Sequence, residues 1–131
     1  MRGASALNEA LQEVAGNPMK VFVVWEPILV TDLQPPTTAA LARVSDVRAA
    51  QFWDKDRQVS KAIAGEITRR GQDAEQHRYR SKGGVLWDTI AIYPPGVKWA
   101  GSGPAPSYTG GPVVDVESEF RKALIIGKLS R

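Results

Sequence analysis

The chain contains no cysteine and only one histidine. Without thiol groups it forms no disulfide, no thiolate nucleophile and no zinc–thiolate site. Thiol–disulfide exchange needs an attacking thiolate, so that reaction is excluded for this sequence. A single histidine also argues against the imidazole clusters that bind transition metals. We therefore expect no metal and no cofactor.

Long hydrophobic runs and a strong excess of one charge are missing as well. No apolar run approaches the length of a membrane-spanning helix, and the first residues lack the apolar core of a signal peptide. The net charge of +3 is too small for the clustered basic surface of a nucleic-acid-binding protein. The sequence predicts a cytoplasmic protein, without a membrane or nucleic-acid partner, folded as one domain over residues 1–131.

The clearest element that is present is a strand at residues 20–25. Its core, 21–25, is an unbroken run of three valines and two aromatic residues. Such a run has no helical stripe and is typical of a strand that is buried on both faces in an α/β sheet. The chain then turns at Glu26 and Pro27, the end of a strand where ligands of open α/β sheets bind.

The remaining sequence alternates between helical and strand patterns. Helices are expected over 4–15, from Thr37 or Thr38 to Val44, over 57–68 and over 117–129. Strands are expected at 49–53 and 85–93, with 97–99 as an antiparallel return, and 101–112 as a surface loop. The order α-β-α-β-α-β-β-α predicts an α/β fold, a mixed sheet with helices on both faces. Its expected core includes Val21, Val23, Phe120 and Leu124.

Several stretches resemble bacterial thioredoxin-like proteins of unassigned function. They are VFVVWEP at 21–27, QFWD at 51–54, LWDTIAIY at 86–93, PPGVKW at 94–99 and GGPVV at 110–114. The resemblance covers about residues 5–130 and implies a thioredoxin-like fold that is entered after its first strand.

Two features of that family are missing. Its redox members carry a Cys-x-x-Cys motif at the start of their first helix, which here falls at or before residues 1–6. They also place a cis-proline before the hairpin strand, where this chain has residues 81–84 without proline. The absent first strand leaves a sheet edge that must be covered or paired.

Acidic residues follow several of the predicted strands. The five nearest to strand ends are Glu26, Asp32, Asp46, Asp54 and Asp88. If Glu26 and Asp54 converge, they form an acid/base pair or a site for a hard cation. Alternatively, Asp32 and Asp54 cap helices or turns, and Asp46 and Asp88 pair with nearby basic residues (Arg43, Arg48 or Lys98).

His77 is a third catalytic candidate, because it is the only histidine. It lies in a polar stretch, 69–84, without the Ser/Asp arrangement of a triad, so a surface-loop histidine is the alternative. The basic residues of 69–82 offer a phosphate-binding or nucleic-acid-binding segment. Asp73 and Glu75 interrupt the positive charge, which favours a solvated loop.

Aromatic residues give the binding candidates. Trp25, Trp53, Tyr93 and Trp99 fall in or beside predicted strands, where together with Pro27 they can line an apolar pocket. The alternative is that they belong to the core, as aromatic residues in strands usually do.

Two functions follow from these observations. The first is a non-redox thioredoxin-like binding or interaction module that self-associates through its uncovered sheet edge, and so forms a homo-oligomer. The second is a small hydrolase that uses carboxylates near the C-terminal ends of the strands, with or without a divalent cation.

Overall fold

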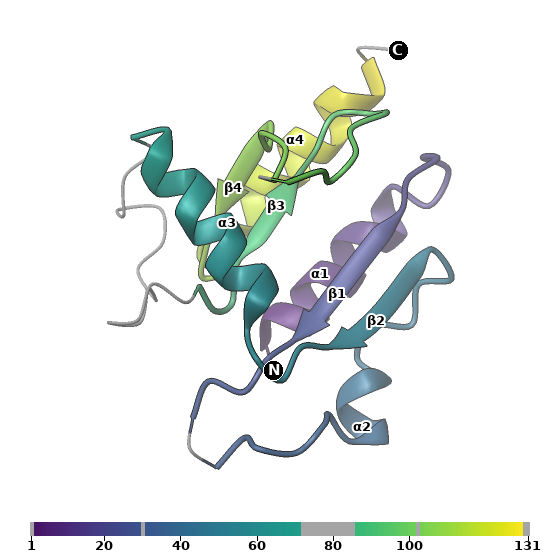
Figure 1. Cartoon of the computed structure of the whole chain (residues 1–131). Helices are drawn as coiled ribbons and strands as arrows, with labels where there is room; N and C mark the ends of the chain where they lie inside the picture. Colours follow the sequence, from purple (N-terminus) through teal and green to yellow (C-terminus); the bar gives the residue numbers. More distant parts are fainter. Residues whose placement is uncertain (1, 30, 72–85, 102, 130–131) are drawn as a thin grey trace.

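The computed structural model describes residues 2–29, 31–71, 86–101 and 103–129. The elements follow one another as α1 (Arg2–Glu13), β1 (Val21–Trp25), α2 (Thr38–Leu41), β2 (Ala49–Trp53), α3 (Gln58–Arg69), β3 (Ile90–Ile92), β4 (Tyr108–Gly110) and α4 (Glu117–Leu129). The mixed α/β class predicted from the sequence is therefore confirmed (Figure 1). None of the helices in these ranges has the length and hydropathy needed to span a membrane.

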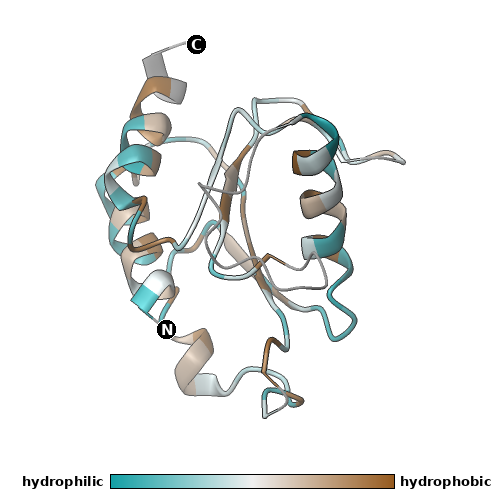
Figure 2. Ribbon diagram, turned by 90° about the vertical axis from the view of Figure 1, so that its left-hand side faces the viewer, coloured by the Kyte–Doolittle hydropathy of each residue, from teal (hydrophilic) through white to brown (hydrophobic). Residues whose placement is uncertain are grey.

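The strands form two pairs. β1 and β2 are parallel, with Val21 opposite Ala49 and Trp25 opposite Trp53. β3 and β4 are antiparallel, with Ile90 opposite Gly110. Within the described ranges no strand pairing connects the two pairs. Figure 2 shows the strands edge-on, between α3 on one side and α1 with α4 on the other.

The larger apolar core lies between α1, α4 and the β3–β4 hairpin. Its centre is Phe120 of α4, which is 0% exposed, and the small side chains of Ala6 and Ala10 on α1 pack in the same cluster. Leu124, one turn after Phe120, packs against it. These two core predictions are confirmed. Val21 and Val23 are only half-buried.

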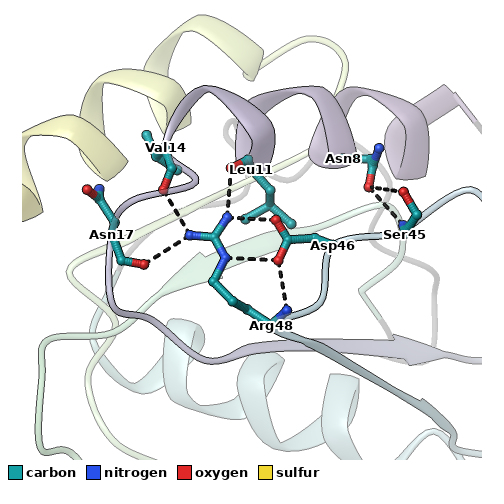
Figure 3. Close-up of polar contacts among 7 residues, drawn as sticks. All are labelled: Asn8, Leu11, Val14, Asn17, Ser45, Asp46 and Arg48. Carbon is teal, nitrogen blue, oxygen red and sulfur yellow. Dashed lines mark hydrogen bonds and ion pairs between the residues drawn. The ribbon is translucent and has the colours of Figure 1, made fainter.

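Arg48 connects the start of β2 to the end of α1 (Figure 3). Its guanidinium donates to the carbonyl oxygens of Leu11, Val14 and Asn17 at 2.7, 2.8 and 3.0 Å. It also donates to both carboxylate oxygens of Asp46, at 2.9 and 2.7 Å. A helix C-terminus leaves carbonyl groups without helical partners, and a cation there also suits the helix dipole. Arg48 thus supplies, from outside the helix, the hydrogen bonds that the carbonyl groups at the end of α1 lack.

The hairpin differs from the one expected. The predicted return strand at 97–99 is wrong, because β3 pairs with Tyr108–Gly110 inside the stretch that was expected to be a loop. Ser107 donates its backbone N–H to the Ile92 carbonyl at 2.7 Å, which fixes this register. Tyr108 then packs against the α1–α4 core, whereas Trp99 is left 49% exposed.

The predicted strand at 85–93 is also too long, since regular pairing is confined to Ile90–Ile92. Asp88 has a φ of 51°, in the left-handed region, which interrupts an extended strand. Close approach of α1 accompanies this bend. A Cβ added at Gly3 would lie 2.1 Å from Asp88 Oδ1, so a larger residue at position 3 would require the Asp88 side chain to move.

Candidate functional site

The C-terminal ends of β1 and β2 carry the two carboxylates that the sequence singled out. Because Trp25 lies opposite Trp53 in a parallel pair, the next residues, Glu26 and Asp54, are neighbours. The Asp54 N–H extends the ladder by one bond, to the Trp25 carbonyl at 2.9 Å. The structure therefore brings Glu26 and Asp54 together, as expected from the position of both at strand ends.

Both carboxylates face the first turn of α3. Asp54 Oδ2 accepts a hydrogen bond from the Val59 N–H at 2.8 Å, and Glu26 Oε1 accepts one from the Ser60 N–H at 3.0 Å. The residue at the N-cap, Arg57, makes no side-chain capping bond. Two carboxylates from the strands thus satisfy amide groups that a helix N-terminus leaves free. The capping role weighed for Asp54 is confirmed.

Glu26 has a perturbed acidity. Burial raises its pKa above the usual value, the hydrogen bonds from Ser60 oppose that rise, and the negative charge of Asp54 adds to it. A carboxyl group with a raised pKa, beside a second carboxylate, is the arrangement of many acid/base pairs. In the portion of the chain that the structure describes, no group of three or more His, Cys, Asp or Glu side chains is placed to hold a metal ion.

Arg57 lies at the same end of the sheet in an unusual conformation. Its φ of 58° and ψ of 37° are left-handed, which is uncommon for a residue with a side chain. Its Nε atom is buried and has no hydrogen-bond partner within the described ranges. This end of the β1–β2 sheet therefore keeps a polar group unsatisfied, in contrast to the end at Arg48.

The two tryptophans at the strand ends are half-buried. Trp25 donates its Nε1–H to Gln51 Oε1 at 2.9 Å. Gln51 in turn donates to the carbonyl oxygens of Leu41 and Val44, at 2.9 and 3.1 Å, where α2 ends. This chain of bonds holds α2 against the sheet, so the arrangement favours a structural role for Trp25.

Tyr93 and Trp99 lie in the connection between β3 and β4, away from the ends of β1 and β2 along the chain. Burial raises the pKa of Tyr93, and the negative charge of Glu66, in the last turns of α3, raises it further. Glu26 and Asp54 contact the first turn of that helix. Trp99 is half-exposed and lies over Gly103, where an added Cβ would be 3.0 Å from its ring. That Tyr93 and Trp99 share a binding site with Trp25 and Trp53 stays a prediction.

The basic segment 69–82 is described only at its start. Arg69 and Arg70 both form ion pairs with the carboxylate of Glu66, whose pKa is lowered, mainly by the hydrogen bond from Arg70. The charge of these two arginines is therefore engaged by the protein itself. His77 and the rest of this segment lie outside the described residues.

A second candidate site, which the sequence reasoning missed, is the outer face of β1 and β2. The prediction of a strand buried on both faces is wrong for this face. Phe22 is 64% and Phe52 is 50% exposed, and their ring centroids are 6.1 Å apart. Ala50 beside them is exposed and Val24 is half-buried. We call these four residues the Phe22–Phe52 face. Figure 1 shows α1 behind β1.

The sequence alone did not reveal this face because an apolar run carries no sign of which side is covered. In a strand, alternate residues point to opposite faces, so Phe22 and Val24 share a face. The parallel register then adds Ala50 and Phe52. That register depends on contacts between segments far apart in the chain.

No protein-family model, no curated protein and no solved structure matches this chain. The function is therefore argued from the geometry of the molecule.

Proposed function

We propose that this chain is a non-redox thioredoxin-like interaction module that associates with a second copy of itself. The observation that carries the proposal is the Phe22–Phe52 face. Parallel sheets are normally covered on both faces. Here Phe22 is more than half exposed and Phe52 is half exposed, although both lie on a parallel strand pair. Exposed apolar surface of this kind is typical of interaction sites.

The edge of the sheet supports the same proposal. Among the described strands, β2 pairs only with β1, so its other edge is open. Natural edge strands are protected from association by lysine, proline or a bulge. β2 reads Ala-Ala-Gln-Phe-Trp and pairs with β1 in unbroken register. It has none of these protective features.

Light scattering on a size-exclusion column tests the proposal. We expect the apparent mass to rise from monomer toward dimer between low and high micromolar concentration. Phe52→Ser should weaken this association, because it removes half-exposed apolar surface from the face and edge. Leu33→Ser is the matched control, since Leu33 is 67% exposed in a loop away from the strands. A clean monomer at several hundred micromolar would contradict self-association.

A hydrolase is the second candidate, and the pairing of Glu26 with Asp54 favours it. Burial raises the pKa of Glu26, and its neighbour accepts a bond from a backbone amide. A protonated carboxyl can donate a proton to a leaving group while the second carboxylate activates water. No step requires a thiol.

A substrate screen of ester, phosphoester and glycoside compounds tests this candidate, with and without EDTA to reveal any use of a divalent cation. Activity should fall at least about 100-fold in Glu26→Gln and in Asp54→Asn if both groups transfer protons. Asp32→Asn is the control, because that carboxylate only closes a turn with Leu29. Activity that survives both substitutions would remove these residues from the mechanism.

A further inference from the structure

We infer that two copies of the chain join through their β2 strands, which run antiparallel around a twofold axis at Gln51. This inference rests on the proposed function and names the contact surface. It comes from three properties of Ala49–Trp53: the direction of its free backbone groups, the sizes of its side chains and its lack of charge.

The free backbone groups belong to alternate residues of β2. Val21 donates to the Arg48 carbonyl at 3.2 Å and Asp54 donates to the Trp25 carbonyl at 2.9 Å. Because backbone groups alternate in direction along a strand, the even-numbered residues of β2 face β1. The odd-numbered residues Gln51 and Trp53 therefore direct their N–H and C=O groups toward the open edge.

An antiparallel copy centred on Gln51 matches these groups. The two Gln51 residues exchange N–H···O bonds across the axis, as a hydrogen-bonded pair does. Each Trp53 N–H reaches the Ala49 carbonyl of the other copy. The Ala49 N–H is already used, since it donates to the Asp46 carbonyl at 3.0 Å. A register centred on Gln51 does not depend on that group.

The side chains are self-complementary in the same register. Ala50 of one copy lies opposite Phe52 of the other, and Ala49 lies opposite Trp53. On both faces a small residue thus meets a large one, and the twofold axis repeats each contact. The Gln51 side chains at the axis are already bonded to α2 and Trp25, so the dimer leaves no new amide unsatisfied.

The lack of charge on β2 and the small area of the interface together indicate how strong the contact is. Ala49–Trp53 contains no charged residue, so no like charges meet between the paired strands. One short edge strand with part of a sheet face is smaller than the ~800 Å² per partner of a standard interface. We therefore expect a weak dimer that forms in the micromolar range or above.

Disulfide trapping tests the register, and the absence of cysteine makes the readout clean. Ala50→Cys and Phe52→Cys proteins are mixed under mild oxidation and analysed by mass. The opposed positions form a non-hydrogen-bonded pair with Cα atoms about 4.5 Å apart, within disulfide range. The mixed 50–52 cross-link should exceed each homodimer by about fivefold or more.

The outcomes separate the inference from the proposed function. A dominant 50–50 or 52–52 cross-link, or a light-scattering dimer in which neither position cross-links above Ala62→Cys on the exposed side of α3, overturns the inference and leaves self-association standing. A monomer at all concentrations overturns both.

An edge-blocking substitution gives a second reading that does not depend on oxidation. Ala50→Lys places a charge on an exposed position of the edge strand and should weaken dimerisation at least about tenfold. Ala62→Lys makes the same change at an exposed position of α3 and should leave dimerisation unchanged. Circular dichroism verifies that both variants fold. Equal dimerisation of Ala50→Lys and wild type would contradict the edge contact.

Discussion

The two ends of the β1–β2 sheet differ in how fully their charged residues are hydrogen-bonded. At the start of β2, Arg48 bonds to Asp46 and to three carbonyl oxygens at the end of α1. At the far end, Glu26 and Asp54 share the first turn of α3, and the buried Nε of Arg57 lacks a partner among the described residues. We call the first the complete end, because the Arg48 guanidinium has hydrogen-bond partners there. We call the second the incomplete end, because of the unpartnered Arg57 Nε.

The pKa values of the carboxyl groups at the two ends are shifted in opposite directions. The hydrogen bond from Arg48 lowers the pKa of Asp46, whereas burial raises the pKa of Glu26. A lowered pKa indicates a charge that stabilises the fold, and a raised one indicates a charge that the fold tolerates at a cost. A carboxyl group with a pKa perturbed by burial and by a second carboxylate is a candidate for a functional site.

The largest expected effect is at the complete end. Arg48→Met should reduce the free energy of unfolding by about 3 kcal/mol, because it leaves the Asp46 carboxylate and the α1 carbonyl groups without their partner. Urea denaturation measures it. Arg43→Met, at an exposed arginine, should cost less than about 0.5 kcal/mol. Equal losses in the two variants would show that Arg48 is not the anchor of α1.

Neutralising one carboxyl at each end of the sheet should change the stability in different directions. Asp46→Asn should destabilise the protein by about 1–2 kcal/mol, since it removes the ion pair with Arg48 and leaves one acceptor oxygen where the guanidinium now bonds to two. Glu26→Gln keeps an oxygen to accept from Ser60 and removes a buried charge, so stability at pH 7 should stay equal or rise slightly. If Glu26→Gln proved the more damaging change, the two ends would not differ as described.

The pH dependence of stability should separate the same two groups. The contribution of Asp46 is present above its unfolded pKa of about 3.9 and is lost as the pH falls through its lower folded value. Glu26 has the opposite sign, because its contribution is present below about pH 4.3 and is lost as the pH rises through its higher folded value. Denaturation between pH 3 and pH 7 measures both.

Each substitution should remove one part of that profile. Glu26→Gln should abolish the gain in stability that comes as the pH falls through the raised folded pKa of Glu26, and Asp46→Asn should reduce the loss at lower pH. Asp32→Asn serves as the control, since its carboxylate only closes an exposed turn. An unchanged profile in Glu26→Gln would mean that folding does not raise the pKa of Glu26.

The smallest effect concerns the backbone of Arg57. Arg57→Gly should stabilise the protein by about 0.5 kcal/mol, because glycine adopts the left-handed conformation without strain and removes the unpartnered Nε atom. The converse change, Gly71→Ala at a φ of +63°, should destabilise it by about 1 kcal/mol. Differential scanning calorimetry resolves both shifts. A destabilised Arg57→Gly would indicate that its guanidinium is needed at the incomplete end.

Local signals in the sequence predicted the helices well. The α4 helix has the expected bounds, Glu117–Leu129, and its i, i+4 pair Phe120 and Leu124 faces the core. The meeting of Glu26 and Asp54 was one of two alternatives that the sequence left open, and it needs only two parallel strands with acids after each. Short-range periodicity and position at strand ends carry that information.

The features that escaped prediction depend on contacts between distant segments. β3 pairs with Tyr108–Gly110, whose Tyr108 packs against the α1–α4 core, rather than with the nearer residues 97–99. The Phe22–Phe52 face depends on the β1–β2 register and on which side the helices cover. The role of Arg48 at the end of α1 spans 31 to 37 residues of sequence, and no local pattern encodes it.

The attachment of α3 to both strands has a consequence for how the molecule opens. The Ser60 amide is held by Glu26, 34 residues earlier in the chain, and the Val59 amide by Asp54. The first turn of α3 therefore cannot fray while β1 and β2 stay paired, unlike an ordinary helix end. In native-state hydrogen exchange, these two amides should share the protection of the β1–β2 ladder, and the helix start and the parallel strands should form one cooperative unit.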